Sequence, residues 1–204
     1  MRRAAASHDI AREEHQRGRY LNRVLEKKNL RLALKRVKAN RGAAGVDGMS
    51  VDELGPYLKE KWPTIKEELL AGTYRPAPVK QVDIPKPDGG TRGLGIPTVP
   101  DRFIQQAILQ VLTPIFEPTF SDQSFGFRPG KSAHQAVKAA RNFIEEGFDF
   151  CVDLDIEKFF DRVNHNRLMA KPAKSIHDKA LLKLIRRYLK AGILIFRTYK
   201  IYNR

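Results

Sequence analysis

Carboxylates at alternating positions in the sequence DFCVDLDI are the side chains of this chain best suited to chemistry. Asp149, Asp153 and Asp155 fall at odd positions, and large apolar residues fall at the even positions between them. A period of two predicts a β-strand over 149–156 with one acidic face and one apolar face. Carboxylates on one face repel one another, and Mg²⁺, which prefers oxygen ligands, would remove that repulsion. A solvated acidic sheet face is the alternative interpretation.

The residues after this strand favour the metal-binding alternative. Asp155 opens the run DIEKFFD at 155–161, which resembles the first catalytic motif of reverse transcriptases. The resemblance implies that Asp155 is catalytic, that Asp155 and the Ile156 carbonyl hold Mg²⁺, and that Phe160 lies under the sugar of the incoming nucleotide. Phosphoryl transfer suits such a site, because metal ions that bridge the reacting oxygens supply most of the catalysis. A core aromatic beside Phe159 is the alternative role for Phe160.

The charge of the chain indicates a polyanionic partner. Its 204 residues carry 38 Lys and Arg against 23 Asp and Glu, a net charge of +15, and counterion release makes such a surface bind nucleic acid. No apolar run approaches the roughly 20 residues of a membrane-spanning helix, and the N-terminus lacks the apolar core of a secretory signal. The lone Cys151 cannot form an intrachain disulfide. We therefore expect a cytoplasmic protein with an RNA partner and no membrane partner.

The N-terminal part is predicted to be helical and basic. Apolar periodicity indicates helices over 7–29 and 30–39, followed by the glycine-rich loop 40–48, NRGAAGVDG. This loop resembles the extension in front of the fingers of group II intron-encoded reverse transcriptases, and a plain surface loop is the alternative. The basic residues at the approach to this loop, Arg36, Lys38 and Arg41, favour contacts with RNA. The first helix could pack on the body or on a second copy of the chain, which makes a homodimer a candidate assembly.

Strand periodicity returns in the next segment. A capping-box pattern at Ser50 and Glu53 first predicts a helix, or two helices broken at Pro63, to about residue 70. Strands are then predicted over 79–84 and 92–96 around the turn signal PDGG. The run IPKPDGGTRGLGIP resembles the fingers hairpin of the same family, which implies that Lys86 and Arg92 hold the nucleotide triphosphate. Two exposed cations on a turn are the alternative.

A wide apolar stripe predicts a buried helix over 100–116. The sequence FGFRPGK at 125–131 is a further family marker. Its aromatics interleaved with basic residues favour RNA contacts by Arg128 and Lys131, and a core role for Phe125 and Phe127 is the alternative. Ser132 and Gln135 form a second capping box, which opens a helix to Gly147. Further helices are predicted over 164–169 and 174–191.

Together these elements predict an α+β fold: the fingers of a right-hand polymerase with an incomplete palm and a helical N-terminal extension. The expected parts are 1–73, the helical extension and start of the fingers; 74–147, the fingers hairpin and support helices; and 148–204, the partial palm with the first catalytic motif and a C-terminal helix. The 149–156 strand is expected to form the palm sheet over the helices 100–116 and 132–146.

The resemblance covers about residues 25–193 and stops at ILIFRTYKIYNR, 193–204, which does not look like the family's continuation. In the family a PQG motif and an aromatic-Ala-Asp-Asp hairpin follow and supply further metal-binding carboxylates. The resemblance therefore implies a bacterial RNA-directed DNA polymerase that binds group II intron RNA, an RNA template with a DNA primer, and dNTPs, and that takes part in splicing and retrohoming.

The same departure limits what we expect of residues 1–204. Mg²⁺ binding should be weak or absent, and the chain alone should not polymerise. An RNA-binding fragment or relic without polymerase activity is the alternative function, and a nuclease that uses Asp153 and Asp155 is a weaker third. The partner intron, the template preference and the role of 193–204 are not determined by the sequence.

Overall fold

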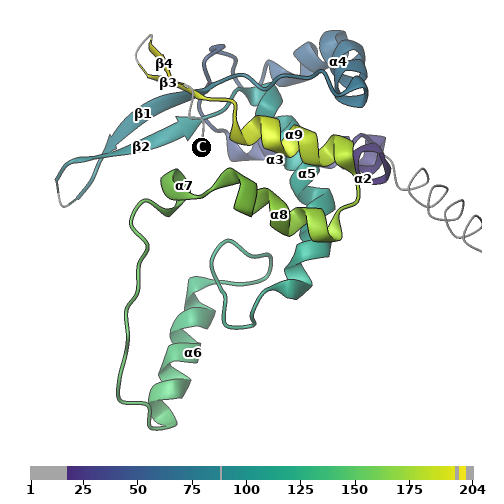
Figure 1. Ribbon diagram of the computed structural model, residues 1–204. Helices are drawn as coiled ribbons and strands as arrows, with labels where there is room; N and C mark the ends of the chain where they lie inside the picture. The colour runs from purple at the N-terminus through teal and green to yellow at the C-terminus, as the bar shows by residue number, and fades with distance from the viewer. Residues whose placement is uncertain (1–17, 88, 196–197, 201–204) are drawn as a thin grey trace, which may run out of the picture. The chain divides into compact units, whose positions relative to one another are not determined.

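The computed structural model describes residues 18–87, 89–195 and 198–200, and the chain divides into two compact units. Unit 1 comprises Met1–Val111 and Asn164–Arg204, and unit 2 comprises Leu112–Val163. Figure 1 shows the elements of each unit along the chain. The two units do not follow the predicted boundaries at 73/74 and 147/148, because the C-terminal helices belong with the N-terminal part.

Unit 1 is built mainly from helices: α2 (Arg19–Val24), α3 (Lys27–Asn40), α4 (Leu54–Ala71), most of α5 (Val99–Phe116), α8 (His165–Ser175) and α9 (Lys179–Leu189). Its core lies where these helices meet, and Leu54, Ile104, Ile176 and Leu181 are at most 2% exposed. Residues 7–17 of the first predicted helix lie outside the described residues. Across the described ranges, no helix combines the length and the apolar character needed to cross a membrane.

Asp178 joins the two ends of the chain within unit 1. One carboxylate oxygen caps α9 by accepting hydrogen bonds from the backbone N–H groups of Ala180 and Leu181, both at 3.1 Å. The other oxygen accepts from the N–H groups of Tyr20 and Leu21 in the first turn of α2, at 3.0 and 2.8 Å. Because one fully buried side chain caps two helices, α2 and α9 are fixed against each other.

The helix predicted after Ser50 begins at Leu54, three residues later than a cap at Ser50 would place it. The backbone N–H and hydroxyl of Ser50 both donate to the Glu53 carboxylate, at 2.8 and 2.7 Å, but 51–53 form a turn and α4 begins at Leu54. The box therefore closes the turn instead of capping the helix. α4 then continues through Pro63 without a break.

The hairpin is confirmed as β1 (Val79–Pro85) and β2 (Thr91–Ile96), which pair antiparallel with Val82 opposite Leu94. Two short strands from the C-terminal segment, β3 (Ile193–Ile195) and β4 (Thr198–Lys200), complete a sheet of order β2-β1-β3-β4. β3 runs parallel to β1. The segment 193–200, which has no role in the prediction, therefore extends the fingers sheet.

Unit 2 contains a 3₁₀ turn, η1 (Glu117–Thr119), and the helices α6 (Ala133–Glu145) and α7 (Phe159–Arg162). The second capping box is confirmed: the N–H of Ser132 donates to Gln135 Oε1 at 2.8 Å, and the N–H of Gln135 donates to Ser132 Oγ at 3.3 Å.

The palm strand predicted over 149–156 is wrong for this structure. The segment has no strand assignment, and its apolar residues are solvent-exposed, with Phe150 at 96% and Leu154 at 87%. A strand needs a neighbour to satisfy its backbone groups and a layer to cover its apolar face. None of the described strands pairs with this segment, so its alternating pattern has no sheet to join.

Candidate nucleotide and nucleic-acid site

The hairpin places Lys86 and Arg92 near its tip. Ile84 pairs with Arg92 across the strands, and the N–H of Lys86 donates to the Gly90 carbonyl at 3.1 Å. Lys86 comes two residues after Ile84, so it lies on the same face as Arg92 and one step nearer the tip. Both side chains are exposed. A lysine and a forked guanidinium on one face can grip a phosphate chain, as the family resemblance implies.

The base of the hairpin is anchored by a buried carboxylate. Asp101, 2% exposed, accepts hydrogen bonds from the Tyr74 hydroxyl at 2.7 Å, from the Ala77 N–H at 3.0 Å and from the Thr98 hydroxyl at 2.7 Å. These contacts fix the chain just before β1 and just after β2. Burial, reinforced by Asp101, raises the pKa of Tyr74, and burial likewise raises the pKa of Tyr188 in α9. Both phenols therefore stay protonated at neutral pH.

The glycine-rich loop approaches the chain's own backbone. A Cβ on Gly45 would lie 2.7 Å from the backbone N and Cα of Thr98, so only glycine fits against the end of the hairpin. Arg102 donates to the Ala43 carbonyl at 2.7 Å and fixes the loop from α5. Burial lowers the pKa of Arg102. The close approach that the glycines permit is thus used within the fold.

The cations predicted to contact RNA around this loop are all exposed. Arg36 donates to Gln110 on α5 at 3.2 Å, which orients its guanidinium. Lys38 lies in the last turn of α3, and Arg41 ends that helix with a left-handed φ of 46°. These residues remain available to a partner, and their contact with RNA stays a prediction.

Asp155, the predicted catalytic carboxylate, is exposed in unit 2, and its Oδ1 accepts a hydrogen bond from the N–H of Ile156 at 2.8 Å. Among the described residues, no group of three or more His, Cys, Asp or Glu side chains could hold a metal ion. Asp155 and the Ile156 carbonyl thus form an incomplete ligand set, and the residues present do not by themselves fit Mg²⁺. Asp153 is also exposed and adds no third ligand.

Phe160, predicted to contact the sugar, is 87% exposed. It lies two residues after Lys158, which has a left-handed φ of 50°. Its ring centroid lies 5.7 Å from that of Phe159. The alternative of a core aromatic is wrong, because neither ring is buried. Lys86 and Arg92 belong to unit 1, whereas Asp155, Ile156 and Phe160 belong to unit 2. The nucleotide contacts predicted for these five residues stay a prediction.

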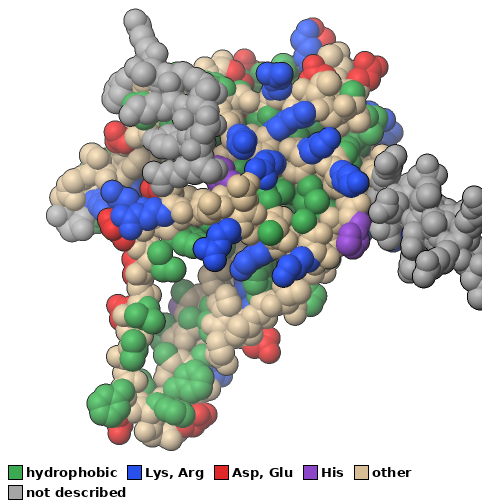
Figure 2. All heavy atoms as spheres, in the orientation of Figure 1, with side chains coloured by type: hydrophobic (Ala, Val, Ile, Leu, Met, Phe, Trp, Pro, Cys, Tyr) green, Lys and Arg blue, Asp and Glu red, His purple; other side chains and the backbone are tan. Residues whose placement is uncertain are grey.

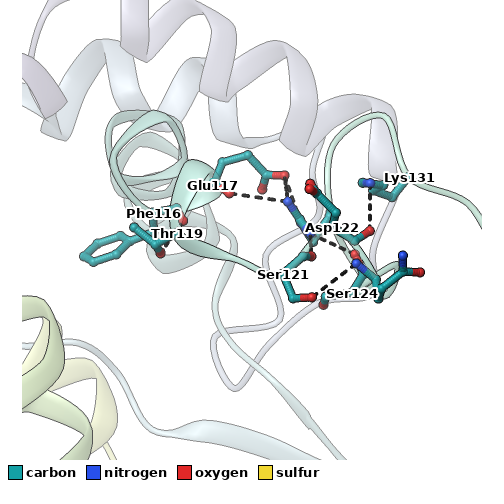
Figure 3. Close-up of polar contacts among 9 residues, drawn as sticks. Phe116, Glu117, Thr119, Ser121, Asp122, Ser124 and Lys131 are labelled. Carbon is teal, nitrogen blue, oxygen red and sulfur yellow. Dashed lines mark hydrogen bonds and ion pairs between the residues drawn. The ribbon is translucent and has the colours of Figure 1, made fainter.

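Arg128 contacts residues of its own loop, among them Glu117, Ser121 and Ser124, which Figure 3 labels. Its guanidinium pairs with the Glu117 carboxylate at 2.8 Å, donates to the Ser121 and Ser124 carbonyls, and lies 5.3 Å from the Phe120 ring centroid. Its side chain is only 9% exposed. Most of its donors already have partners, so its first role is to hold this loop together, and an RNA contact at Arg128 stays a prediction.

Lys131 belongs to the same loop. Its ammonium donates to the Asp122 carbonyl at 3.0 Å and lies 5.2 Å from the Phe125 ring centroid. The side chain is half-buried, so its first role is also to close the FGFRPGK loop. One donated bond leaves two N–H groups of the ammonium, and an RNA contact at Lys131 stays a prediction.

Asp101 and Asp178 are the organising residues that sequence reasoning missed. Each stands in or just before the first turn of a helix, where an acidic residue is ordinarily interpreted as an exposed cap. Only the packing of distant segments shows that both carboxylates are buried. Thr98 three residues before Asp101 was the one local sign of a capped helix start.

The hairpin with paired cations, the support helix and the DIEKFFD segment follow one another in the order of a template-directed polymerase of the right-hand class. The sequence profile of the reverse transcriptase (RNA-dependent DNA polymerase) family matches residues 84–203, and the chain belongs to this family. The matched range includes β3, so the C-terminal segment, which looked unlike the family's continuation, lies inside the homologous region.

Curated relatives support the resemblance to intron-encoded enzymes. Protein YkfC of Escherichia coli is 35% identical over 152 residues, which are 72% of this chain and 40% of YkfC. The group II intron-encoded protein LtrA of Lactococcus lactis is 37% identical over 164 residues, which are 80% of this chain and 27% of LtrA. The chain therefore spans less than half the length of these relatives.

A solved structure supports the fold. A chain of the partial Cas6-RT-Cas1–Cas2 complex matches with a TM-score of 0.55 at 20% identity, covering 86% of this chain and 28% of that one. At this identity the likeness concerns the fold alone.

Proposed function

We propose that residues 1–204 are the fingers and part of the palm of a group II intron-encoded reverse transcriptase and maturase. The whole protein binds its intron RNA, copies an RNA template into DNA from a DNA primer with dNTPs, and takes part in splicing and retrohoming. Similarity to LtrA, which is named a group II intron-encoded protein, supports the intron partner. A location in the bacterial cytoplasm and self-association of the chain belong to the same proposal.

The observation that carries the proposal is the β1–β2 hairpin. It holds Lys86 and Arg92 on one exposed face, and its base is fixed by the buried Asp101. Such a rigid base with a cationic tip is suited to bind the triphosphate of a nucleotide that enters beside a template. The DIEKFFD segment then supplies the carboxylate of Asp155 and the exposed ring of Phe160.

Residues 1–204 by themselves are proposed to bind RNA without polymerising. Asp155 lies in a segment with no neighbour among the described strands, and catalysis by two metal ions needs carboxylates brought together from more than one strand. A nuclease that uses Asp153 and Asp155 lacks the same ligands among the described residues, and it would leave Lys86, Arg92 and Phe160 without a role.

Primer extension on an RNA template tests the function. We expect DNA synthesis from the longest natural form of the protein, and none from residues 1–204, with RNA binding by both. Synthesis by residues 1–204 would show that the Asp155 segment needs no partner strands. Failure of both forms to bind RNA at low salt would overturn the proposed function as a whole.

The hairpin is tested within the active form. Replacing Lys86 and Arg92 by Ala should raise the KM for dNTPs, because both charges contact the triphosphate. Lys80→Ala is the matched control, since Lys80 is exposed on the same face of the hairpin near its base. An equal rise in the KM for dNTPs in the tip and base variants would contradict a specific role of Lys86 and Arg92 in binding the triphosphate.

A further inference from the structure

Unit 1 contains a cationic cleft that no sequence motif identifies. It has a volume of about 480 Å³, and five of its seven lining residues are basic: Arg75, Lys183, Arg186, Arg187 and Lys190. The other two are a proline and an alanine, so the lining formed by the described residues contains no carboxylate and no aromatic ring. Within the described part of the chain, none of the five cations forms an ion pair.

Three arginines of the cleft are positioned by contacts within unit 1, two of them through the network around Asp101. Arg187 donates to the Tyr74 carbonyl at 3.0 Å, and the Tyr74 hydroxyl donates to Asp101 at 2.7 Å. The N–H of Ala77 donates to the same carboxylate, so the backbone that carries Arg75 is fixed on both sides. Arg186 donates to Asn166 of α8. Each guanidinium has five N–H donors, so one internal bond fixes its plane and leaves donors for a ligand.

The cleft lies on a longer basic row of α9. Lys179, Lys183, Arg186 and Lys190 repeat at intervals of four, three and four residues, so they share one face of the helix, opposite the buried Leu181 and Leu184. From the first to the last residue the row measures about 16 Å along the helix axis. Figure 2 shows Lys and Arg side chains gathered over the α8 and α9 region of this face.

We propose that this cleft and the α9 row bind the phosphate backbone of RNA, an inference that rests on the proposed function. Converging cations without a carboxylate partner favour an anion, and an extended row fits a polymer with regularly spaced phosphates better than a single small anion. Cations bind phosphates and do not read base edges, and the described lining offers no ring for base stacking, so we expect a contact that is independent of base sequence.

The test uses the full chain and single-stranded RNA of two unrelated sequences, titrated over a series of salt concentrations. Lys183 and Lys190 are both replaced by Gln. The control replaces Lys59 and Lys66 of α4 by Gln; both are equally exposed, and the change in charge is the same. We expect the cleft variant to weaken binding of both RNAs equally. The slope of log affinity against log salt should fall by about 1.4, or about 0.7 for each phosphate that no longer has a lysine partner.

Each outcome separates the inference from the function on which it rests. No RNA binding by the unaltered chain would overturn the proposed function. Binding by the unaltered chain, with equal slopes for the cleft and control variants, would overturn only the cleft. Competition by poly-glutamate that the cleft variant abolishes, without a change in RNA affinity, would assign the cleft to an acidic protein partner and overturn the inference. Displacement of RNA by pyrophosphate at constant ionic strength, with no change in the salt slope of the cleft variant, would assign the cleft to a small phosphate. This result would also overturn the inference.

Discussion

Asp178 shows how much one side chain can determine at the scale of a residue. Its two oxygens accept four backbone hydrogen bonds, two from α2 and two from α9, and the residue is fully buried. These helix ends would otherwise keep unsatisfied N–H groups inside the protein. The charged acceptor also lies favourably at the positive ends of both helices.

We predict that Asp178→Ala lowers the free energy of unfolding by about 2–4 kcal/mol, because buried donors lose a charged acceptor and two helices lose their caps. Urea unfolding of the chain measures the change. Asp52→Ala is the control, since Asp52 is exposed in the turn before α4, and we expect its effect to stay within about 0.5 kcal/mol. An Asp178 variant as stable as this control would show that the caps contribute little.

A second prediction at this scale concerns Arg128. Arg128→Lys should destabilise the FGFRPGK loop almost as much as Arg128→Ala, because an ammonium cannot reach the Glu117 carboxylate and two carbonyls at once. Hydrogen exchange of 117–131 would report the loosening. Arg141→Ala, which breaks an exposed pair with Glu145, is the control and should leave that exchange unchanged. Unchanged protection of 117–131 from hydrogen exchange in the lysine variant would mean that Arg128 does not hold the loop together, and an RNA contact would be its main role.

At the scale of elements, the segment 148–156 behaves differently from the hairpin although both have strand periodicity. β1 has neighbours on both sides, β2 and β3, and the 149–156 segment has none among the described strands. Alternation specifies which face of a strand is apolar, but it supplies neither the neighbour nor the covering layer.

Cys151 offers a direct measurement of this difference, because it lies in the middle of the segment and is exposed. We predict that it reacts with iodoacetamide in folded residues 1–204 as fast as in the urea-unfolded chain. The reagent has no second thiol to modify, since the chain contains one cysteine. Slow alkylation that speeds up only on unfolding would mean that the segment is covered.

The contact between α9 and the base of the hairpin predicts a dependence on alkaline pH. Folding raises the pKa of Tyr74 and Tyr188, so above about pH 10, where tyrosine ionises in an unfolded chain, the unfolded state releases protons that the folded state keeps. The stabilisation is therefore fully present below about pH 10 and is lost as the pH rises beyond it. The double variant with Phe at both positions should lose less stability between about pH 9 and 11 than the unaltered chain, as measured by urea unfolding at each pH. The same pH slope in both proteins would contradict the assignment.

At the scale of the whole molecule, a net charge of +15 should make the affinity for a polyanionic partner depend strongly on salt concentration. RNA affinity should fall linearly on logarithmic axes as salt increases. Replacing Arg36, Lys38 and Arg41 by Ala should weaken RNA binding and reduce the slope of log affinity against log salt, because these exposed cations lie at the glycine-rich loop 40–48. A flat salt response would show that the basic surface serves another purpose.

Catalysis is tested at the same scale in the longest form that supports primer extension. Asp155→Asn should abolish DNA synthesis and leave RNA binding intact, since Asp155 carries the catalytic role that the family motif implies and lies in the acidic segment. Phe160→Ala should instead increase incorporation of ribonucleotides, because the exposed ring no longer excludes the 2′-hydroxyl. Loss of RNA binding in either variant would indicate a folding defect and contradict both assignments.

Local patterns in the sequence predicted most of the described helices, the hairpin around PDGG and the family resemblance, because caps, turns and periodicity act within a few residues. Only the tertiary structure decided which carboxylates are buried, since Asp101 and Asp178 depend on partners tens of residues away in the chain. It also decided that Arg128 closes its own loop, that β3 (Ile193–Ile195) pairs with β1, and that 149–156 has no partner among the described strands. The buried carboxylates and the strand pairing depend on long-range packing, and the contacts of Arg128 depend on how its own loop folds; periodicity and turn signals encode neither.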